Sequence, residues 1–394
     1  MSQENSTSTR LHHLDGLRGI ASFAVFLWHN FLAFFPGAVD PQIPMQAPWL
    51  ERWIFRSPLA ILFAGDFAVY IFFVLSGFVI TVRLFAQKDP DLVRKSFFRR
   101  YVRLMPPAAV TVFASYILLT TGLMYNKEAS VLAHSWWLAL NWSAVDATLI
   151  NATWTAFYGI WFVGIPVTAH FNSNLGTLLI ELVGSYIIFA YLTIAFTFSW
   201  SLCKRVFVLF ALILSSFFIL KDDPHFTVFF VGVLFADIYV HRPLIFEKLA
   251  KLSFIWLLIG IFLGSSNIGN IPTYPYHIIE VFFRAVGLHP LSNPWALGAL
   301  FIMLGTLTSS PARKLLQSTM LQEMGKYSFA LFVAHSVFLG SFTCWLFIVI
   351  SKFGYMSYTW NVFAAFILGL PFLFGIVYLI RKIDDVSVRV SRRL

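Results

Sequence analysis

A histidine lies deep inside the first apolar stretch of the chain. Residues 14–35 carry Asp15 and Arg18 at their start and His29 further along. At about 1.5 Å per residue, a helix of this length crosses the ~30 Å hydrocarbon core of a membrane and places His29 about 16 Å above Arg18. An ionisable side chain at such depth costs about 2.5–3.5 kcal/mol, so it usually faces a protein interior and has a function.

Polar groups in the later apolar stretches fall into two layers when the same helical rise is applied to each. The outer layer holds Asp66, Glu181 and His335 together with His29. The inner layer holds Arg18, Ser76, Arg99, Arg100 and Arg103. A basic inner layer suits the phosphates of a cytosolic donor, and a histidine beside a carboxylate is the usual apparatus of general base catalysis. We therefore expect Glu181 or Asp66 to orient the ring of His29.

Composition places these groups in a membrane protein. The 394 residues are 59% hydrophobic and 12% charged, with a mean hydropathy of +0.77, whereas a soluble domain has about 25% charged residues. Too few polar residues remain to cover a soluble core of this size. The predicted fold class is all-α, a polytopic integral membrane bundle of about ten transmembrane helices. The predicted spans are 14–35, 61–82, 104–123, 176–198, 206–220, 226–240, 252–265, 295–309, 328–350 and 360–380.

The Lys and Arg side chains, 28 in all, indicate the orientation. Most of them fall in alternate loops, which are the cytosolic loops if the N-terminus is cytosolic. We therefore predict that both termini are cytosolic and that 1–394 forms a single membrane domain with a polar N-terminus, 1–13, and a basic tail, 382–394. The net charge of +10 is spread over these loops and not gathered in one patch, so we expect no nucleic-acid partner. An endomembrane and the plasma membrane are both left open.

The long outer loop, 124–175, adds two expectations. Asn141 and Asn151 each begin an Asn-X-Ser/Thr triplet, which makes both predicted glycosylation sites. The apolar segment 154–170 is interpreted as interfacial, because an eleventh span would invert everything downstream and break the charge bias. No histidine and carboxylate pair has the spacing of metal ligands, so we expect no metal site.

Four motifs, in order along most of the chain, resemble those of the membrane-bound acyltransferase-3 family. They are residues 14–21, LDGLRGIA, with His29 ending the span; residues 72–78, FFVLSGF; residues 98–106, FRRYVRLMP; and residues 325–329, GKYSF, leading to His335. In that family an arginine and a histidine on the first helix are separated by ten residues, as Arg18 and His29 are here. The wording of the first motif is closest to fungal members.

The resemblance implies an acyl-CoA donor, with acetyl-CoA expected, and an acceptor hydroxyl on a sugar, lipid or natural product. It implies that His29 is the catalytic histidine and that Arg18 binds the donor. We expect Ser76 and the basic cluster of Arg99, Arg100 and Arg103 to assist, with acyl-CoA as a co-substrate, membrane lipid as a partner and no permanently bound cofactor. Further candidates for the site are Asp15, His335 and Tyr327.

Departures from the family pattern keep other interpretations open. Tyr70 stands where many relatives have an aspartate, Ala108 where they have a tyrosine, and residues 176–180 before Glu181 lack the usual tryptophan-serine-leucine. The arginine cluster also suits a topology signal, and Ser76 suits close helix packing. Buried histidine, arginine and glutamate would serve a proton-coupled transporter or channel equally well. A catalytically silent relative that binds lipid or a partner is the third alternative.

Overall fold

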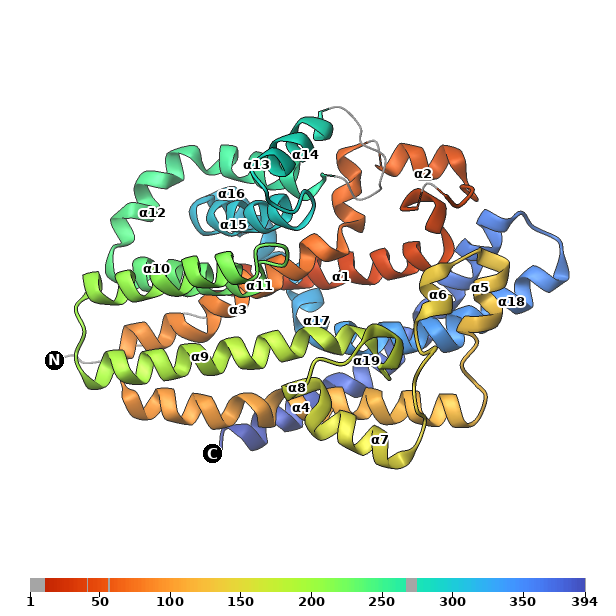
Figure 1. Cartoon of the computed structure of the whole chain (residues 1–394), viewed down its shortest axis with the longest axis horizontal. Helices are drawn as coiled ribbons and strands as arrows, with labels where there is room; N and C mark the ends of the chain where they lie inside the picture. Colours follow the sequence, from red (N-terminus) through yellow and green to blue (C-terminus); the bar gives the residue numbers. More distant parts are fainter. Residues whose placement is uncertain (1–10, 41, 56, 267–274, 394) are drawn as a thin grey trace.

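The fold is helical throughout the part of the chain that the structure describes. The computed structural model describes residues 11–40, 42–55, 57–266 and 275–393, and most long helices run along the long axis of the molecule (Figure 1). Residues 1–10 of the expected cytosolic N-terminus lie outside the described residues. The long helices are α1 (His12–Phe34), α3 (Gly65–Gln87), α4 (Pro90–Thr120), α9 (Thr177–Thr197), α10 (Leu202–Ile219), α17 (Thr319–Phe338) and α19 (Tyr358–Ser391).

Shorter helices connect or cover these. They are α2 (Pro48–Phe55), α5 (Asn126–Ala133), α6 (Trp136–Leu140), α7 (Leu149–Trp154), α8 (Ile160–Phe162), α11 (His225–His241), α12 (Pro243–Leu249), α13 (Ser253–Gly264), α14 (Tyr276–Ala285), α15 (Ser292–Thr308), α16 (Ser310–Leu316) and α18 (Cys344–Phe353).

Seven helices of the described ranges are long and apolar enough to cross a membrane. They are α1, α3, α4, α10, α19, the segment Ser173–Thr197 that contains α9, and the segment Thr319–Phe353 that runs from α17 through α18. The pair α15 and α16 makes an eighth only if both count as one span, and it bends by 94°. Each of the ten predicted segments contains a helix. The count of ten spans is not confirmed, because α11, α13 and α15 have only 17, 12 and 17 residues.

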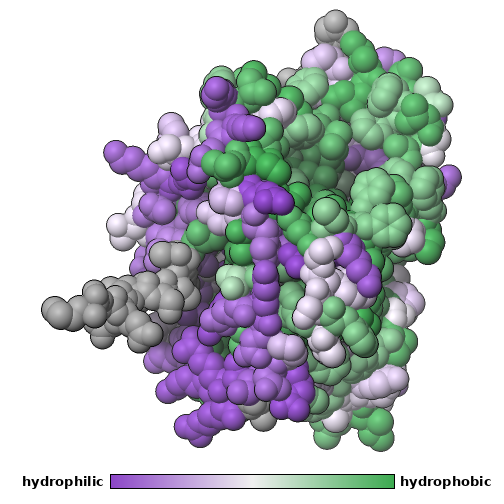
Figure 2. Space-filling view, turned by 90° about the vertical axis from the view of Figure 1, so that its left-hand side faces the viewer, coloured by the Kyte–Doolittle hydropathy of each residue, from purple (hydrophilic) through white to green (hydrophobic). Residues whose placement is uncertain are grey.

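Both ends of the described chain lie at the same end of the bundle, together with the turns between α3 and α4 and between α9 and α10 (Figure 1). The opposite end carries α2, α5, α6 and α18. Viewed from the end with the termini, hydrophilic side chains gather along one side and the lower part of the face, and hydrophobic surface covers the other side (Figure 2). The cytosolic assignment of this end stays a prediction.

Glycine lets two pairs of helices approach backbone to backbone. A Cβ atom at Gly19 of α1 would lie 2.6 Å from the backbone nitrogen of Gly325 on α17. A Cβ at Gly77 of α3 would collide with the carbonyl of Phe229 on α11, and one at Gly232 would collide with the carbonyl of Val74. Small residues at such crossings are the usual means of close packing between membrane helices. These contacts fix α1 against α17 and α3 against α11, the helices that carry most of the site.

The segment after residue 148 does not form an eleventh span. It folds as α7, a π-helical turn over Thr155–Gly159 and α8, which ends at Phe162. Trp161 and Ala156 are buried, while Ile150 and Tyr158 are exposed. The hydroxyl of Tyr101 on α4 donates a 2.7 Å hydrogen bond to the carbonyl of Phe157. The segment is therefore a short amphipathic structure packed on α4.

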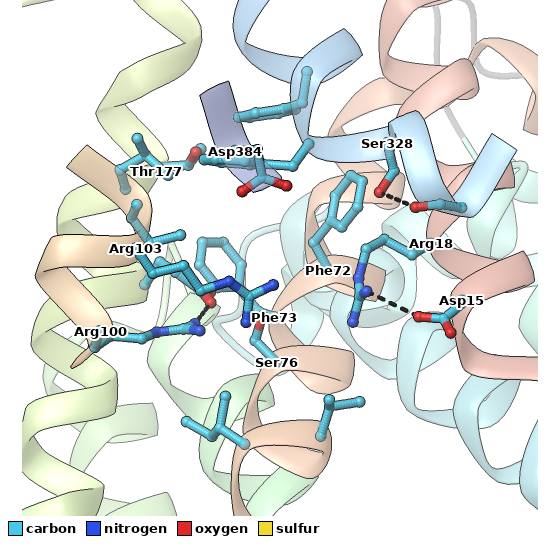
Figure 3. Close-up of a pocket in the computed structure, with 18 of the residues that line it drawn as sticks. Asp15, Arg18, Phe72, Phe73, Ser76, Arg100, Arg103, Thr177, Ser328 and Asp384 are labelled. Atoms are coloured by element: carbon cyan, nitrogen blue, oxygen red, sulfur yellow. Dashed lines mark hydrogen bonds and ion pairs between the residues drawn. The ribbon is translucent and has the colours of Figure 1, made fainter. Parts of the chain in front are cut away.

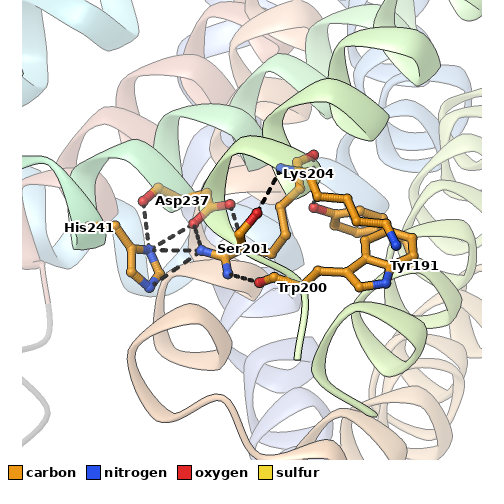
Figure 4. A network of polar contacts seen from close by, with 7 residues as sticks. Tyr191, Trp200, Ser201, Lys204, Asp237 and His241 are labelled. Carbon is orange, nitrogen blue, oxygen red and sulfur yellow. Dashed lines mark hydrogen bonds and ion pairs between the residues drawn. The ribbon is translucent and has the colours of Figure 1, made fainter. Parts of the chain in front are cut away.

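A buried charged network ties α10 to α11 away from the predicted site (Figure 4). The guanidinium of Arg205 donates to both carboxylate oxygens of Asp237, at 2.9 and 2.8 Å, and to the carbonyl of Trp200 at 2.9 Å. His241 Nδ1 lies 2.7 Å from the same carboxylate. The side chains of Arg205 and Asp237 are 4% and 0% exposed, so each charge depends on the other for solvation.

A second buried carboxylate, Glu51, lies on α2 outside the spanning helices. Its Oε1 atom accepts a 2.6 Å hydrogen bond from the backbone nitrogen of Ala47, at the start of the helix. Its Oε2 atom is buried and has no hydrogen-bond partner within the described residues. Burial raises the pKa of Glu51 above its ordinary value of 4.5, against the opposing effect of the backbone hydrogen bonds.

This raised pKa makes stability depend on pH. Below pH 4.5 the carboxyl is protonated in both states, and above it the unfolded chain loses the proton first. The folded state then binds more protons, so stability falls as pH rises toward the folded-state pKa. We expect Glu51→Gln to flatten this fall, measured as the unfolding temperature in detergent between about pH 4 and pH 7. Glu247→Gln, at an exposed position on α12, is the control, and identical pH profiles for Glu51→Gln and wild type would contradict the assignment.

Candidate active site

A pocket of about 220 Å³ lies between α1, α3, α4, α9, α17 and α19 (Figure 3). Its basic side chains are Arg18, Arg100, Arg103, Lys326 and Arg381, and its acidic ones are Asp15, Glu181 and Asp384. Basic groups outnumber acidic ones, so the pocket favours an anionic ligand. Four members of the predicted inner layer, Arg18, Ser76, Arg100 and Arg103, therefore meet in one cavity.

Helical spacing on α4 decides which arginines reach the pocket. Arg103 and Leu104 follow Arg100 by three and four residues, so all three lie on the side of the helix that lines the cavity. Arg99 lies on another face, where its Nη2 atom donates a 3.3 Å hydrogen bond to the carbonyl of Arg392 at the end of α19. Arg99 is thus not one of the pocket residues, contrary to expectation. The same periodicity on α3 brings Phe72, Phe73 and Ser76 to the cavity.

Ion pairs compensate part of the charge. Arg100 is buried and forms an ion pair with Glu181, and its Nε atom donates a 3.1 Å hydrogen bond to Ser185. Arg18 pairs with Asp15 at 3.2 Å across one turn of α1. Figure 3 shows Arg18 and Arg103 reaching into the cavity from opposite walls. Within the described residues Arg103 makes no hydrogen bond, and it is exposed to the cavity that it lines.

The tail of α19 supplies two pocket residues that sequence reasoning missed. Arg381 Nη1 donates a 2.8 Å hydrogen bond to Asp384 Oδ2, while Asp384 Oδ1 is buried without a hydrogen-bond partner among the described residues. The apolar signal ends near residue 380, but the helix continues to Ser391. The Arg and Asp residues after the apolar run suggested only a cytosolic tail. The three-residue spacing of Arg381 and Asp384, which puts both on one face of a helix, was the signal that the helix continues.

A histidine pair lies beyond the pocket. His29 Nδ1 is 2.8 Å from His335 Nε2, and His335 Nδ1 is 2.8 Å from the carbonyl oxygen of Leu331. A carbonyl only accepts hydrogen bonds, so in the neutral pair His335 carries its proton on Nδ1 and its lone pair on Nε2. His29 must then donate from Nδ1, which leaves the lone pair of His29 on Nε2. That nitrogen is the one that can accept a proton.

The loop before α9 also contacts this pair. Asn174 Nδ2 lies 2.9 Å from His335 Nε2 and 3.1 Å from the carbonyl of Phe332, and Asn172 Nδ2 donates to the carbonyl of Val333 at 2.7 Å. The loop thus enters the bundle at the level of His335. Asn174 was not predicted, because an asparagine in a loop has no distinguishing sequence signal without a known partner.

Phe332 contacts both the pocket and the histidine pair. Phe332 lines the pocket, and its ring meets that of His335 edge to face at a centroid distance of 6.3 Å. Phe332 also packs edge to face against Phe72, at 5.8 Å. His29 and His335 are not pocket-lining residues, but His335 follows Phe332 by three residues, about one turn of α17.

The structure corrects the expected partners of His29. Glu181 pairs with Arg100 in the pocket, because the loop before α9 dips into the bundle and α9 begins deeper than a span starting at the outer rim would. Asp66 is exposed in the first turn of α3 and interacts electrostatically with His225 and Asp223. The partner of His29 is His335, so the prediction of a carboxylate partner is wrong.

Tyr327 and the predicted glycosylation sites lie in surroundings that differ from those expected. Tyr327 is absent from the pocket lining and packs against the hydrophobic core. Asn141 is 1% exposed, and its amide donates a 2.8 Å hydrogen bond to the carbonyl of Trp137. A glycan cannot be accommodated on a buried amide that is already hydrogen-bonded, so the folded chain does not present Asn141 for modification. Asn151 is half-buried, with its amide bonded to the carbonyl of Asp146 at 2.9 Å.

The fold and the site define a multi-pass α-helical membrane protein with a basic pocket beside a buried histidine pair. The chain belongs to the acyltransferase domain family, whose model matches residues 11–382. It is also 33% identical over 123 residues to O-acetyltransferase PaAT-1 of Phomopsis amygdali, a match of 28% of this chain and 24% of that relative. The chain thus matches about a quarter of the length of that relative. No solved structure matches the chain.

Proposed function

We propose that the protein is a membrane O-acyltransferase that moves an acyl group, in the first instance acetyl, from acyl-CoA to a hydroxyl of a sugar, lipid or natural product. The observation that carries the proposal is a basic pocket whose lining residue Phe332 contacts the histidine pair, together with hydrogen bonds in that pair that leave the lone pair on His29 Nε2. Membership of the acyltransferase domain family and the partial similarity to a fungal O-acetyltransferase support the same reaction.

The donor is assigned to the basic pocket. Coenzyme A carries several phosphate charges, and guanidinium groups bind phosphate through charge-assisted hydrogen bonds. Arg103 makes no hydrogen bond within the described part of the chain and faces the cavity, so its donors are available to a ligand. Arg18 and Arg381 reach the same cavity, while Arg100 is held by Glu181 and contributes charge from the wall.

The reaction follows from the tautomer of His29. The acceptor hydroxyl transfers its proton to His29 Nε2 as its oxygen attacks the thioester carbonyl. The positive charge that develops on His29 is stabilised through Nδ1–H by the lone pair of His335. The carbon–sulfur bond breaks, and the coenzyme A thiolate takes the proton back from His29. An ester and a free thiol are formed, and no acyl-enzyme is required.

Arg103→Ala should weaken donor binding. Loss of a charge-assisted hydrogen bond costs about 1.5–3 kcal/mol, so KM for acetyl-CoA is expected to rise about 10- to 100-fold, with a smaller change in kcat. The control is Arg94→Ala on the same helix, because Arg94 is 68% exposed and, among the described residues, its ion pair is with the exposed Asp91. Equal KM values for the two variants would remove Arg103 from the donor site.

The proposal as a whole is tested with purified protein in detergent and labelled acetyl-CoA. With a hydroxyl-containing extract as the source of acceptors, the enzyme should release free thiol and form an equal amount of labelled, alkali-labile ester. The same protein in liposomes tests the transporter alternative. Flux of protons or solute without cleavage of the thioester would reject the acyltransferase proposal in favour of transport.

A further inference from the structure

Trp137 lies against the proposed base. Its indole is offset-stacked over the imidazole of His29, with ring centroids 5.3 Å apart and an angle of 25° between the planes. The tryptophan comes from α6 in the loop at the end of the bundle opposite the termini (Figure 1). It is 7% exposed, although His29 itself is only half-buried.

The neighbouring residue shows that Trp137 is not a lipid anchor. Trp136 is 41% exposed on the same short helix, whereas Trp137 points inward. Tryptophan at a membrane interface usually keeps part of its ring accessible to headgroups, which fits Trp136. The large apolar face of Trp137 instead covers one face of the His29 imidazole.

Hydrogen bonds hold the loop in place over α1. Ser135 Oγ caps α6 by accepting from the backbone nitrogen of Leu138 at 3.2 Å, and it donates to the carbonyl of Leu32 on α1 at 3.2 Å. The amide of Asn126 donates to the carbonyls of Leu138 and Asn141, at 2.8 and 3.0 Å. The amide of Asn141 then donates to the carbonyl of Trp137 itself. The buried asparagine of the glycosylation triplet is thus part of this support.

We propose that Trp137 covers one face of the His29 ring and limits the access of water to this base, so that the activated acyl group goes to a hydroxyl substrate and not to water. The inference rests on the proposed function, because it matters only if His29 removes a proton. A base beside a thioester accepts a proton from water as readily as from an alcohol, and exclusion of water is how active sites suppress such hydrolysis.

The unwanted reaction is hydrolysis of the acyl-CoA thioester. Water gives its proton to His29 Nε2 as its oxygen attacks the thioester carbonyl, and the carbon–sulfur bond breaks. The thiolate takes the proton, which leaves a carboxylic acid and free coenzyme A. Thiol release from acetyl-CoA in the absence of any acceptor therefore measures how well water is excluded.

Trp137→Ala should raise this acceptor-free thiol release at least about tenfold over wild type, while the matched variant Trp136→Ala should leave it unchanged. Trp137→Phe, which keeps an aromatic face, should return the rate toward wild type. If Trp137 had only a structural role, Trp137→Ala would lose activity. A gain of hydrolysis therefore distinguishes the exclusion of water from a structural role. If Trp137→Ala remains folded and its hydrolysis does not rise, the inference is overturned.

Two further variants keep the test decisive. Ser135→Ala loosens the loop without removing the indole and should raise hydrolysis in the same direction by a smaller factor, which serves if Trp137→Ala does not fold. The double variant His29→Ala/Trp137→Ala should lose the gained hydrolysis. Hydrolysis that persists in the double variant rejects His29 as the base. A wild type that transfers through His29 without a gain in either loop variant rejects the role of Trp137 alone.

Discussion

His29→Ala is expected to lower kcat for acyl transfer by about 10²- to 10⁴-fold, the usual contribution of a positioned general base. The hydrogen bonds within the histidine pair use the lone pair of His335 and leave that of His29 Nε2, which can take the proton of the substrate hydroxyl. His29→Gln should be equally inactive, because glutamine can donate to His335 but cannot take up the proton. The measurement is labelled ester formed from acetyl-CoA under single-turnover conditions.

The partner variant separates orientation from proton transfer. His335→Ala removes the acceptor of the His29 Nδ1 proton and leaves the tautomer of His29 undetermined, so activity should fall by a smaller factor than in His29→Ala. His335→Gln, whose amide oxygen can accept that proton, should recover part of the loss. Unfolding temperatures close to wild type are the control for each variant. Full activity in His29→Ala would show that the base has been wrongly assigned.

Asp237→Ala is expected to destabilise the folded protein by about 3–5 kcal/mol, the cost of leaving a buried charge without its partner. Arg205 is 4% exposed and loses both of its hydrogen bonds to the carboxylate. The carbonyl of Trp200 remains as an acceptor at 2.9 Å, which cannot balance the charge. Equilibrium unfolding in mixed micelles provides the measurement.

Two variants show whether the unpaired charge is responsible. Replacing both partners, in Arg205→Met/Asp237→Leu, removes the charge together with its counter-charge and should restore most of the lost stability. Arg94→Ala breaks an ion pair whose partners are 68% and 73% exposed, so it should change stability by about 0.5 kcal/mol or less. A double variant as unstable as Asp237→Ala would place the effect in packing and not in electrostatics.

Depth along a helix could be predicted from the sequence, because each residue adds the same rise. This is why Arg18, Ser76, Arg100 and Arg103, far apart in the chain, were correctly expected at one level and do line one pocket. The same arithmetic placed Glu181 too far out. It assumed that the fourth span begins at the membrane rim, whereas the loop carrying Asn172 and Asn174 enters the bundle and bonds to α17.

Rotation about each helix axis, and therefore the partner of each side chain, depends on the packing of neighbouring helices. A histidine on α17 is a core residue or a partner of His29 depending only on how α1 and α17 meet, and that contact is set by Gly19 and Gly325. The rotation of α4 about its axis likewise directs Arg99 to the end of α19 and Arg100 into the pocket.

The sequence by itself determined the helical membrane fold, the family motifs and the basic level of the pocket, because apolar run lengths and residue identities are local properties. Only the tertiary structure decided that His335 is the partner of His29, that α19 contributes Arg381 and Asp384 to the pocket, and that Trp137 covers the base. Those contacts join segments more than a hundred residues apart, and nothing local in either segment specifies the other.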